Sequence, residues 1–215
     1  MSETISPRQS DAPLQTNNRN RFLSAMMTPV GCRLSGTSRI AIDGMLAAVY
    51  FALTFLTINT GSFKITFASL AFVIAALLFG PLDAMAVAFV GEFLYQLIIF
   101  GLTPTTPIWL IPPVLHALRL GVFAVLMGTR EKPLAARPVA CVLACLDCGF
   151  FNAIFNTAAL YADSKIYGYY NFKMIFVMGL YRILIAMAAA AVICAVVIPL
   201  IYVLRKRVPG LAGNN

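Results

Sequence analysis

The most constraining feature of the sequence is a series of apolar stretches, each of about 20 residues, that lack a polar face. The chain is 60% hydrophobic and only 11% charged. In a soluble globular domain about a quarter of the residues are charged. Lipid must therefore surround most of the chain, and we predict an all-α integral membrane protein.

The apolar segments predict six transmembrane helices. The second is the shortest, because its roughly 15 residues rise only about 22 Å, less than the roughly 30 Å hydrocarbon core, so we expect it to be short or tilted. A membrane domain at 39–205 is expected between a disordered tail at 1–38 and a short tail at 206–215. The predicted helices span 39–57, 65–79, 82–101, 108–128, 139–161 and 172–204.

Lysine and arginine in the connecting segments predict the orientation. With a cytoplasmic N-terminus, the outside segments hold only Lys64, Lys165 and Lys173. Both termini are therefore predicted to be cytoplasmic, and the net charge of +8 indicates topology signals and no nucleic-acid partner. The inside segments then hold Arg8, Arg19, Arg21, Arg33, Arg39, Arg130, Lys132, Arg137, Arg205, Lys206 and Arg207.

Two arginines deep in the predicted helices are candidates for binding an anionic ligand. An ionisable group at the centre of a membrane helix costs about 2.5–3.5 kcal/mol on insertion scales, so Arg119 and Arg182 need a reason to be there. Either they pair with Glu92 or Asp147 as packing contacts, or one of them clamps a substrate carboxylate. His116 lies one turn before Arg119 and adds an imidazole on the same side.

Amide side chains form a second group of candidates. Asn152 and Asn156 lie four residues apart on one helix, where both can face a polar ligand, and Gln96 can join them. Hydrogen bonding between helices is the competing interpretation. Trp109 can stack on an aromatic ligand or serve as an interfacial anchor.

The cysteines and the absent motifs limit the chemistry. Four cysteines fall inside apolar segments, so we expect free thiols. Three of them, Cys141, Cys145 and Cys148, share one helix face, but without a nearby histidine or a fourth thiol we predict no metal site. No phosphate-binding loop or hydrolase motif occurs, so we expect neither catalytic residues nor a cofactor, and ATP must be used by other proteins.

Several stretches resemble the S components of energy-coupling factor (ECF) transporters, specifically their folate-family branch. They are MLAAVYFALTFLTI, FKITFASLAFVIAALLFGPLDAMAVAFVGEFLYQ, TPTTPIWLIPP, FNTAALY and YRILIA, within residues 39–205. The resemblance implies a bacterial plasma-membrane subunit that binds a vitamin and works with a membrane coupling protein and two cytoplasmic ATPases. It also implies that the loop with Lys64 covers the pocket.

The resemblance leaves the vitamin open. Family members often carry a lysine after the arginine of the sixth helix, whereas Arg182 is followed by Ile183. Folate is the first choice, and pantothenate, cobalamin and a queuosine precursor remain alternatives. A small face at Ala48 and Ala52 resembles the alanine motif that meets the coupling protein, and Ala84 and Ala88 form a similar pair.

Two rival functions follow from the same residues. A self-sufficient secondary transporter of a small organic anion would use Asp147 or Glu92 as its proton site. A membrane enzyme or assembly factor would use His116 and the acidic residues chemically, although no acid and base have a suitable spacing.

Overall fold

The computed structural model describes residues 36–59, 64–128 and 133–207, and it confirms a helical membrane protein. Five helices are long and apolar enough to cross a membrane, and α3 is a shorter apolar helix. All six predicted helices are present. The elements are α2 (Gly36–Phe55), β1 (Thr57–Asn59), β2 (Lys64–Thr66), α3 (Ser69–Leu78), α4 (Pro81–Ile99), α5 (Thr106–Met127), η1 (Leu134–Ala136), α6 (Pro138–Tyr167), η2 (Lys173–Val177) and α7 (Met178–Arg207).

The connection between the first two helices contains a β-hairpin where the sequence predicted helical ends. Strands β1 and β2 pair antiparallel, with Thr57 opposite Thr66 and Ile58 opposite Ile65. The prediction of helix at residue 57 and from residue 65 was therefore wrong. β-Branched residues favour strands, and all four residues of these two pairs are β-branched.

Helix ends also differ from the prediction. Residues 36–38, expected in the N-terminal tail, form the first turn of α2, and α7 stays helical through Arg207. The rest of the predicted tail lies outside the described residues. Helix α6 extends six residues beyond 161, because Asp163 and Ser164 are buried with hydrogen-bond partners and Gly168, at φ +75°, ends the helix.

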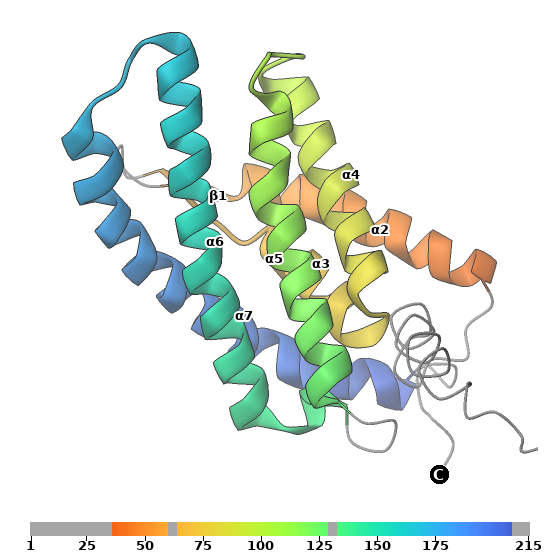
Figure 1. Cartoon of the computed structure of the whole chain (residues 1–215). Helices are drawn as coiled ribbons and strands as arrows, with labels where there is room; N and C mark the ends of the chain where they lie inside the picture. Colours follow the sequence, from red (N-terminus) through yellow and green to blue (C-terminus); the bar gives the residue numbers. More distant parts are fainter. Residues whose placement is uncertain (1–35, 60–63, 129–132, 208–215) are drawn as a thin grey trace, which may run out of the picture.

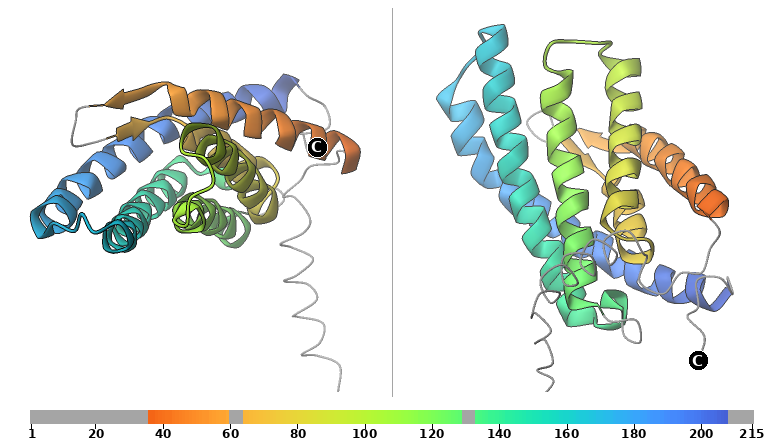
Figure 2. Two further views of the ribbon diagram at one scale, coloured as in Figure 1. Left: turned by 90° about the horizontal axis from the view of Figure 1, so that it is seen from above. Right: turned by 45° about the vertical axis from the view of Figure 1, so that its right-hand side comes forward.

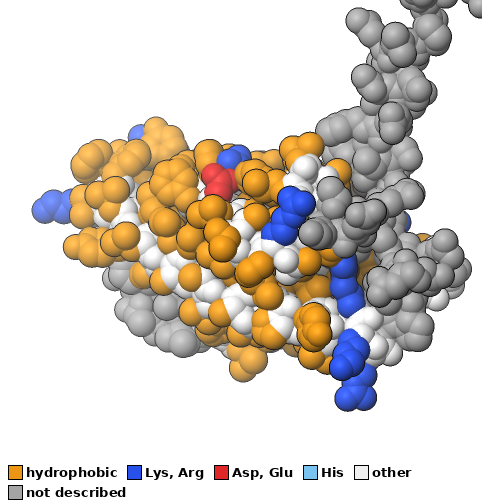
Figure 3. All heavy atoms as spheres, turned by 90° about the horizontal axis from the view of Figure 1, so that it is seen from below, with side chains coloured by type: hydrophobic (Ala, Val, Ile, Leu, Met, Phe, Trp, Pro, Cys, Tyr) orange, Lys and Arg blue, Asp and Glu red, His pale blue; other side chains and the backbone are white. Residues whose placement is uncertain are grey.

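Helices α4, α5 and α6 stand side by side, while α2 and α7 cross them obliquely in a second layer (Figures 1 and 2). Helix α3 is short because it lies inside the bundle: every residue from 71 to 78 is buried. Two glycines allow close approach, since a Cβ at Gly121 would lie 2.3 Å from Pro81 Cα and one at Gly91 would lie 2.4 Å from the Tyr50 ring. Seen from below, hydrophobic side chains make up much of the described surface, with Lys and Arg side chains among them (Figure 3).

An ion pair joins the first turns of two helices. The guanidinium of Arg39 on α2 donates to the carboxylate of Asp83 on α4. This ion pair lies near the starts of both helices. It places the start of α2 beside the start of α4, on the side predicted to be cytoplasmic.

Candidate solute-binding cavity

A cavity of about 760 Å³ lies among α2, α3, α4, α5, α6 and α7. It is lined mainly by the second halves of α2, α4 and α6 and by the first halves of α3, α5 and α7, and it reaches down α6 to Cys145. Because successive helices run in opposite directions, these halves meet on the side predicted to be outside (Figure 1). The volume falls within the range of about 300–1,000 Å³ that small-molecule sites occupy.

A carboxylate in the cavity wall is held by two neighbours. Tyr50 Oη donates to Glu92 Oε2 over 2.8 Å, and Gln96 Nε2 donates to Glu92 Oε1 over 2.8 Å. Tyr50 lies on α2, and its ring packs against Gly91 of α4. Gln96, predicted to contact a polar ligand, therefore lies in the cavity wall, and its amide nitrogen already donates a hydrogen bond to Glu92.

A second carboxylate lies at the outer end of the cavity. Asp163 of α6 accepts a hydrogen bond from Trp109 Nε1 of α5 over 3.2 Å and another from the hydroxyl of Tyr169. Burial and the hydrogen bond to this carboxylate raise the pKa of Tyr169 to about 12. The segment that follows α6 is thereby fastened to two helices beside the cavity.

Amides and one guanidinium complete the polar wall. Asn156 Nδ2 donates to the backbone oxygen of Asn152 over 2.9 Å and to its Oδ1 over 3.1 Å. Both residues and Arg182 of α7 line the cavity, and so does His116. The centroids of the His116 and Phe72 rings are 4.9 Å apart in an edge-to-face arrangement. The structure therefore brings together five of the predicted residues: His116, Arg182, Asn152, Asn156 and Gln96.

Arg119 lies elsewhere. Its Nε donates to Asp147 Oδ2 over 2.7 Å, and its guanidinium carbon lies 3.7 Å from the centroid of the Phe151 ring. It is not among the residues that line the cavity. The two arginines therefore do not share the cavity, and the packing interpretation holds for Arg119.

The remaining predicted residues either do not line the cavity or have side chains outside the described part of the structure. Lys64 is on β2 opposite Asn59, and its side chain is outside the described part of the structure. Ala48 and Ala52 are exposed on the outer face of α2. Ala84 and Ala88 are 0% exposed. They pack the core within the bundle.

Sequence reasoning missed two of the polar residues in the wall. Tyr50 gave no signal, because a tyrosine in an apolar helix resembles any interfacial aromatic residue. Asp163 was placed in a loop, because the polar run ADSK follows an apolar stretch. Trp109, the one tryptophan of the chain, was the only indication in the sequence of this outer end of the cavity, because we considered that it can stack on a ligand.

These features define a class of protein: a multi-pass membrane bundle that encloses a solute-sized cavity with a few convergent polar groups. The family model for ECF-type riboflavin transporter S components matches residues 35–206, so the chain belongs to that family. The family is one of transporter subunits and not of enzymes. The resemblance to ECF S components seen in the sequence is confirmed, but its folate branch is not.

A solved structure shares the fold. It is described as "Structure and mechanism of the S component of a bacterial ECF transporter", and it aligns with a TM-score of 0.60 at 19% identity. The alignment covers 80% of this chain and 98% of that one. No curated protein matches the sequence.

Proposed function

We propose that this protein captures a riboflavin-like vitamin from outside a bacterial cell and delivers it inward. The observation that carries this proposal is the cavity, which combines aromatic walls with hydrogen-bonding groups, in a chain that belongs to a family named for riboflavin transport. A flavin ring is flat and apolar at one edge and carries an imide at the other. Its sugar-like chain adds hydroxyl groups.

The charge of the wall favours a neutral ligand over folate. Among the described lining residues Arg182 is the only cation, whereas Glu92 and Asp163 are both acidic. Folate carries two carboxylates on its glutamate part, and a buried anion needs a paired cation for each charge. Folate therefore becomes the second choice, and the arginine here donates to carbonyl oxygens of the ring.

The polar groups suit the imide and the hydroxyls. The amides of Asn152 and Asn156 offer donors and acceptors to an imide, which has one N–H between two carbonyls. Tyr50 and Trp109 already donate to carboxylates. Those carboxylates keep spare lone pairs that accept hydrogen bonds from ligand hydroxyls.

ATP-driven transport would require partners, since the sequence contains no phosphate-binding loop. We propose that a membrane coupling protein docks on the face of α2 that carries Ala48 and Ala52, and that two cytoplasmic ATPases supply the energy. Both alanines are exposed, which leaves room for another helix to approach closely. A proton-driven transporter would need no such partners.

A fluorescence titration of the detergent-purified protein tests the ligand. Trp109 is the sole tryptophan and lines the cavity, so bound flavin should quench its emission. Riboflavin, folate, pantothenate, thiamine and cobalamin are compared, with Trp109→Phe as the control without signal. Ligand at about 100 times its dissociation constant should also stabilise the protein by about 2.7 kcal/mol in thermal unfolding.

The outcomes separate the proposals. Saturable quenching and stabilisation by riboflavin alone support the flavin assignment. Selective binding of folate would overturn the charge argument but keep the vitamin-binding role. Absence of binding by every vitamin, together with proton-driven uptake in ATPase-free vesicles, would overturn the role itself.

A further inference from the structure

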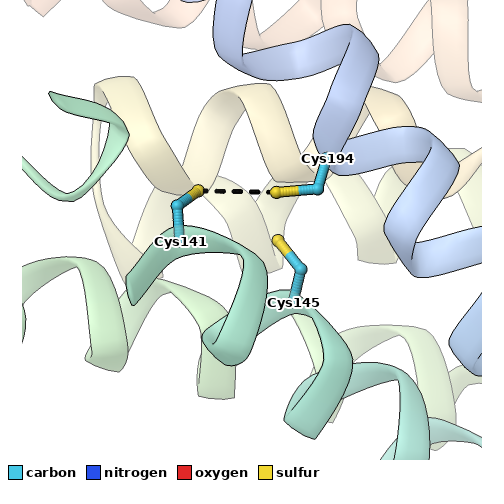
Figure 4. Close-up of side chains that lie close together, drawn as sticks. All are labelled: Cys141, Cys145 and Cys194. Atoms are coloured by element: carbon cyan, nitrogen blue, oxygen red, sulfur yellow. Dashed lines mark hydrogen bonds between the residues drawn. The ribbon is translucent and has the colours of Figure 1, made fainter. Parts of the chain in front are cut away.

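Three buried thiols meet between α6 and α7 (Figure 4). Cys141 and Cys145 lie one turn apart on the same face of α6, and Cys194 faces them from α7. Their sulfur atoms all lie within 4.8 Å of one another, and the Cys194 and Cys141 sulfurs are 3.7 Å apart. All are reduced, and their exposure is 4% or less.

The sequence predicted no metal here because it showed neither a nearby histidine nor a fourth thiol, and it grouped Cys148 with Cys141 and Cys145. Cys148 shares the α6 face in the sequence, but it does not belong to the cluster among the described residues. Cys194, which is 53 positions from Cys141, takes its place across the helix interface. Only the packing of α7 on α6 completes the set.

The spacing matches three ligands around one ion. A metal–sulfur bond of about 2.3 Å puts the sulfurs of a planar three-coordinate site about 4.0 Å apart. The sulfurs are already at 3.7 Å for one pair and within 4.8 Å for the others, so small rotations of the side chains suffice. Because all three thiols are buried, little solvent reaches the sulfur atoms to act as a further metal ligand.

Coordination number then selects the ion. Structural Zn²⁺ takes four ligands, and the described residues offer three thiols here. Soft sulfur ligands suit both Zn²⁺ and Cu(I), but Cu(I) accepts three. The cysteines bind as thiolates, so the ion displaces thiol protons to water.

We propose that Cys141, Cys145 and Cys194 form a three-coordinate Cu(I) site that links α6 to α7. Cys145 also lines the solute cavity, so the site lies at the cavity wall. A bound ion joins the two helices at a second point besides their side-chain packing. The assignment does not depend on which vitamin the cavity holds.

The test uses the full-length protein with Cys32→Ser, which removes the thiol outside the described residues. The protein receives Cu(I) without oxygen and competes with a colorimetric Cu(I) chelator. We expect one copper retained per chain and three sulfur neighbours in X-ray absorption at the copper edge. The melting temperature should rise with added Cu(I).

Variants locate the site. Cys194→Ser and Cys141→Ala should each lower copper retention at least about tenfold, since even partners outside the ligand shell change metal affinity by that factor. Cys148→Ser is the matched control, equally buried on α6 but outside the cluster, and should retain the ion. Circular dichroism and gel filtration verify that each variant is folded.

Three results would overturn the proposal. The first is no copper retained against the chelator by folded protein. The second is unchanged retention in folded Cys194→Ser and Cys141→Ala. The third is Zn(II) bound with Cu(I) excluded, which would show that a fourth ligand completes a different site.

Discussion

At the scale of single residues, the two deep arginines differ in what surrounds them. Arg119 has a carboxylate partner at 2.7 Å and a phenyl ring against its face, outside the cavity. Arg182 lines the cavity, where no carboxylate of the described residues lies within ion-pair distance of it. A half-buried guanidinium without an acidic partner is available to a ligand.

Arg182→Gln should therefore weaken vitamin binding about 10- to 100-fold, the equivalent of a hydrogen bond to a charged group worth about 1.5–3 kcal/mol. The control is the double variant Arg119→Gln with Asp147→Asn, which removes the other pair without leaving a lone charge. It should bind as the wild type does. Quenching of Trp109 measures both affinities, and equal loss in the two variants would contradict the assignment.

Tyr169 gives a prediction about pH. Its pKa is raised from 10.0 to about 12 by burial and by the bond to Asp163. A raised pKa means that the contact is complete below about pH 10, where the unfolded phenol would also be protonated, and is lost as pH rises through about 12. The difference in tyrosinate absorbance between the wild type and Tyr169→Phe should show one phenol titrating late. Its titration near 10 would contradict the contact.

At the scale of elements, close helix contacts set how the cavity is framed. Helix α5 touches the start of α4 at Gly121, where a Cβ would meet the Pro81 backbone at 2.3 Å. Helix α6 touches α7 at Gly149, where a Cβ would lie 3.0 Å from Ala190 Cβ. Backbone has little freedom to move away, so these contacts hold the helices at fixed separations.

Gly121→Ala should lower the free energy of unfolding by about 1–3 kcal/mol, the usual cost of overpacking. Gly44→Ala on α2 is the matched control, because nothing lies within 4 Å of its Cβ position. That change should be neutral or slightly stabilising, since alanine favours helix. Thermal unfolding in detergent compares them, and equal melting temperatures would show that α5 can shift.

At the scale of the whole molecule, the proposed docking face on α2 is separate from the cavity. Ala48 and Ala52 are exposed on α2 and take no part in the cavity wall. Replacing both with leucine should leave vitamin affinity unchanged while uptake falls strongly, because the coupling protein can no longer approach closely. Ala158→Leu, at an exposed position of α6, is the control and should transport normally. Normal uptake by the α2 variant would place the docking surface elsewhere.

The order and length of the apolar segments were enough to predict six helices and the short second helix, because lipid requires every spanning backbone group to bond within its own helix. The same reasoning picked out His116, Arg182, Asn152, Asn156 and Gln96, since polar residues inside a bilayer are rare enough to stand out.

Contacts between helices lay beyond that reasoning. Which arginine faces the cavity, which carboxylate Tyr50 meets and which thiol joins Cys141 all depend on the rotation and tilt of each helix. Those are set by close packing at sites such as Gly91, Gly121 and Gly149, where the fit of neighbouring side chains decides. Periodicity within one helix carries no information about that fit, because the partner residues lie tens of positions away in the chain.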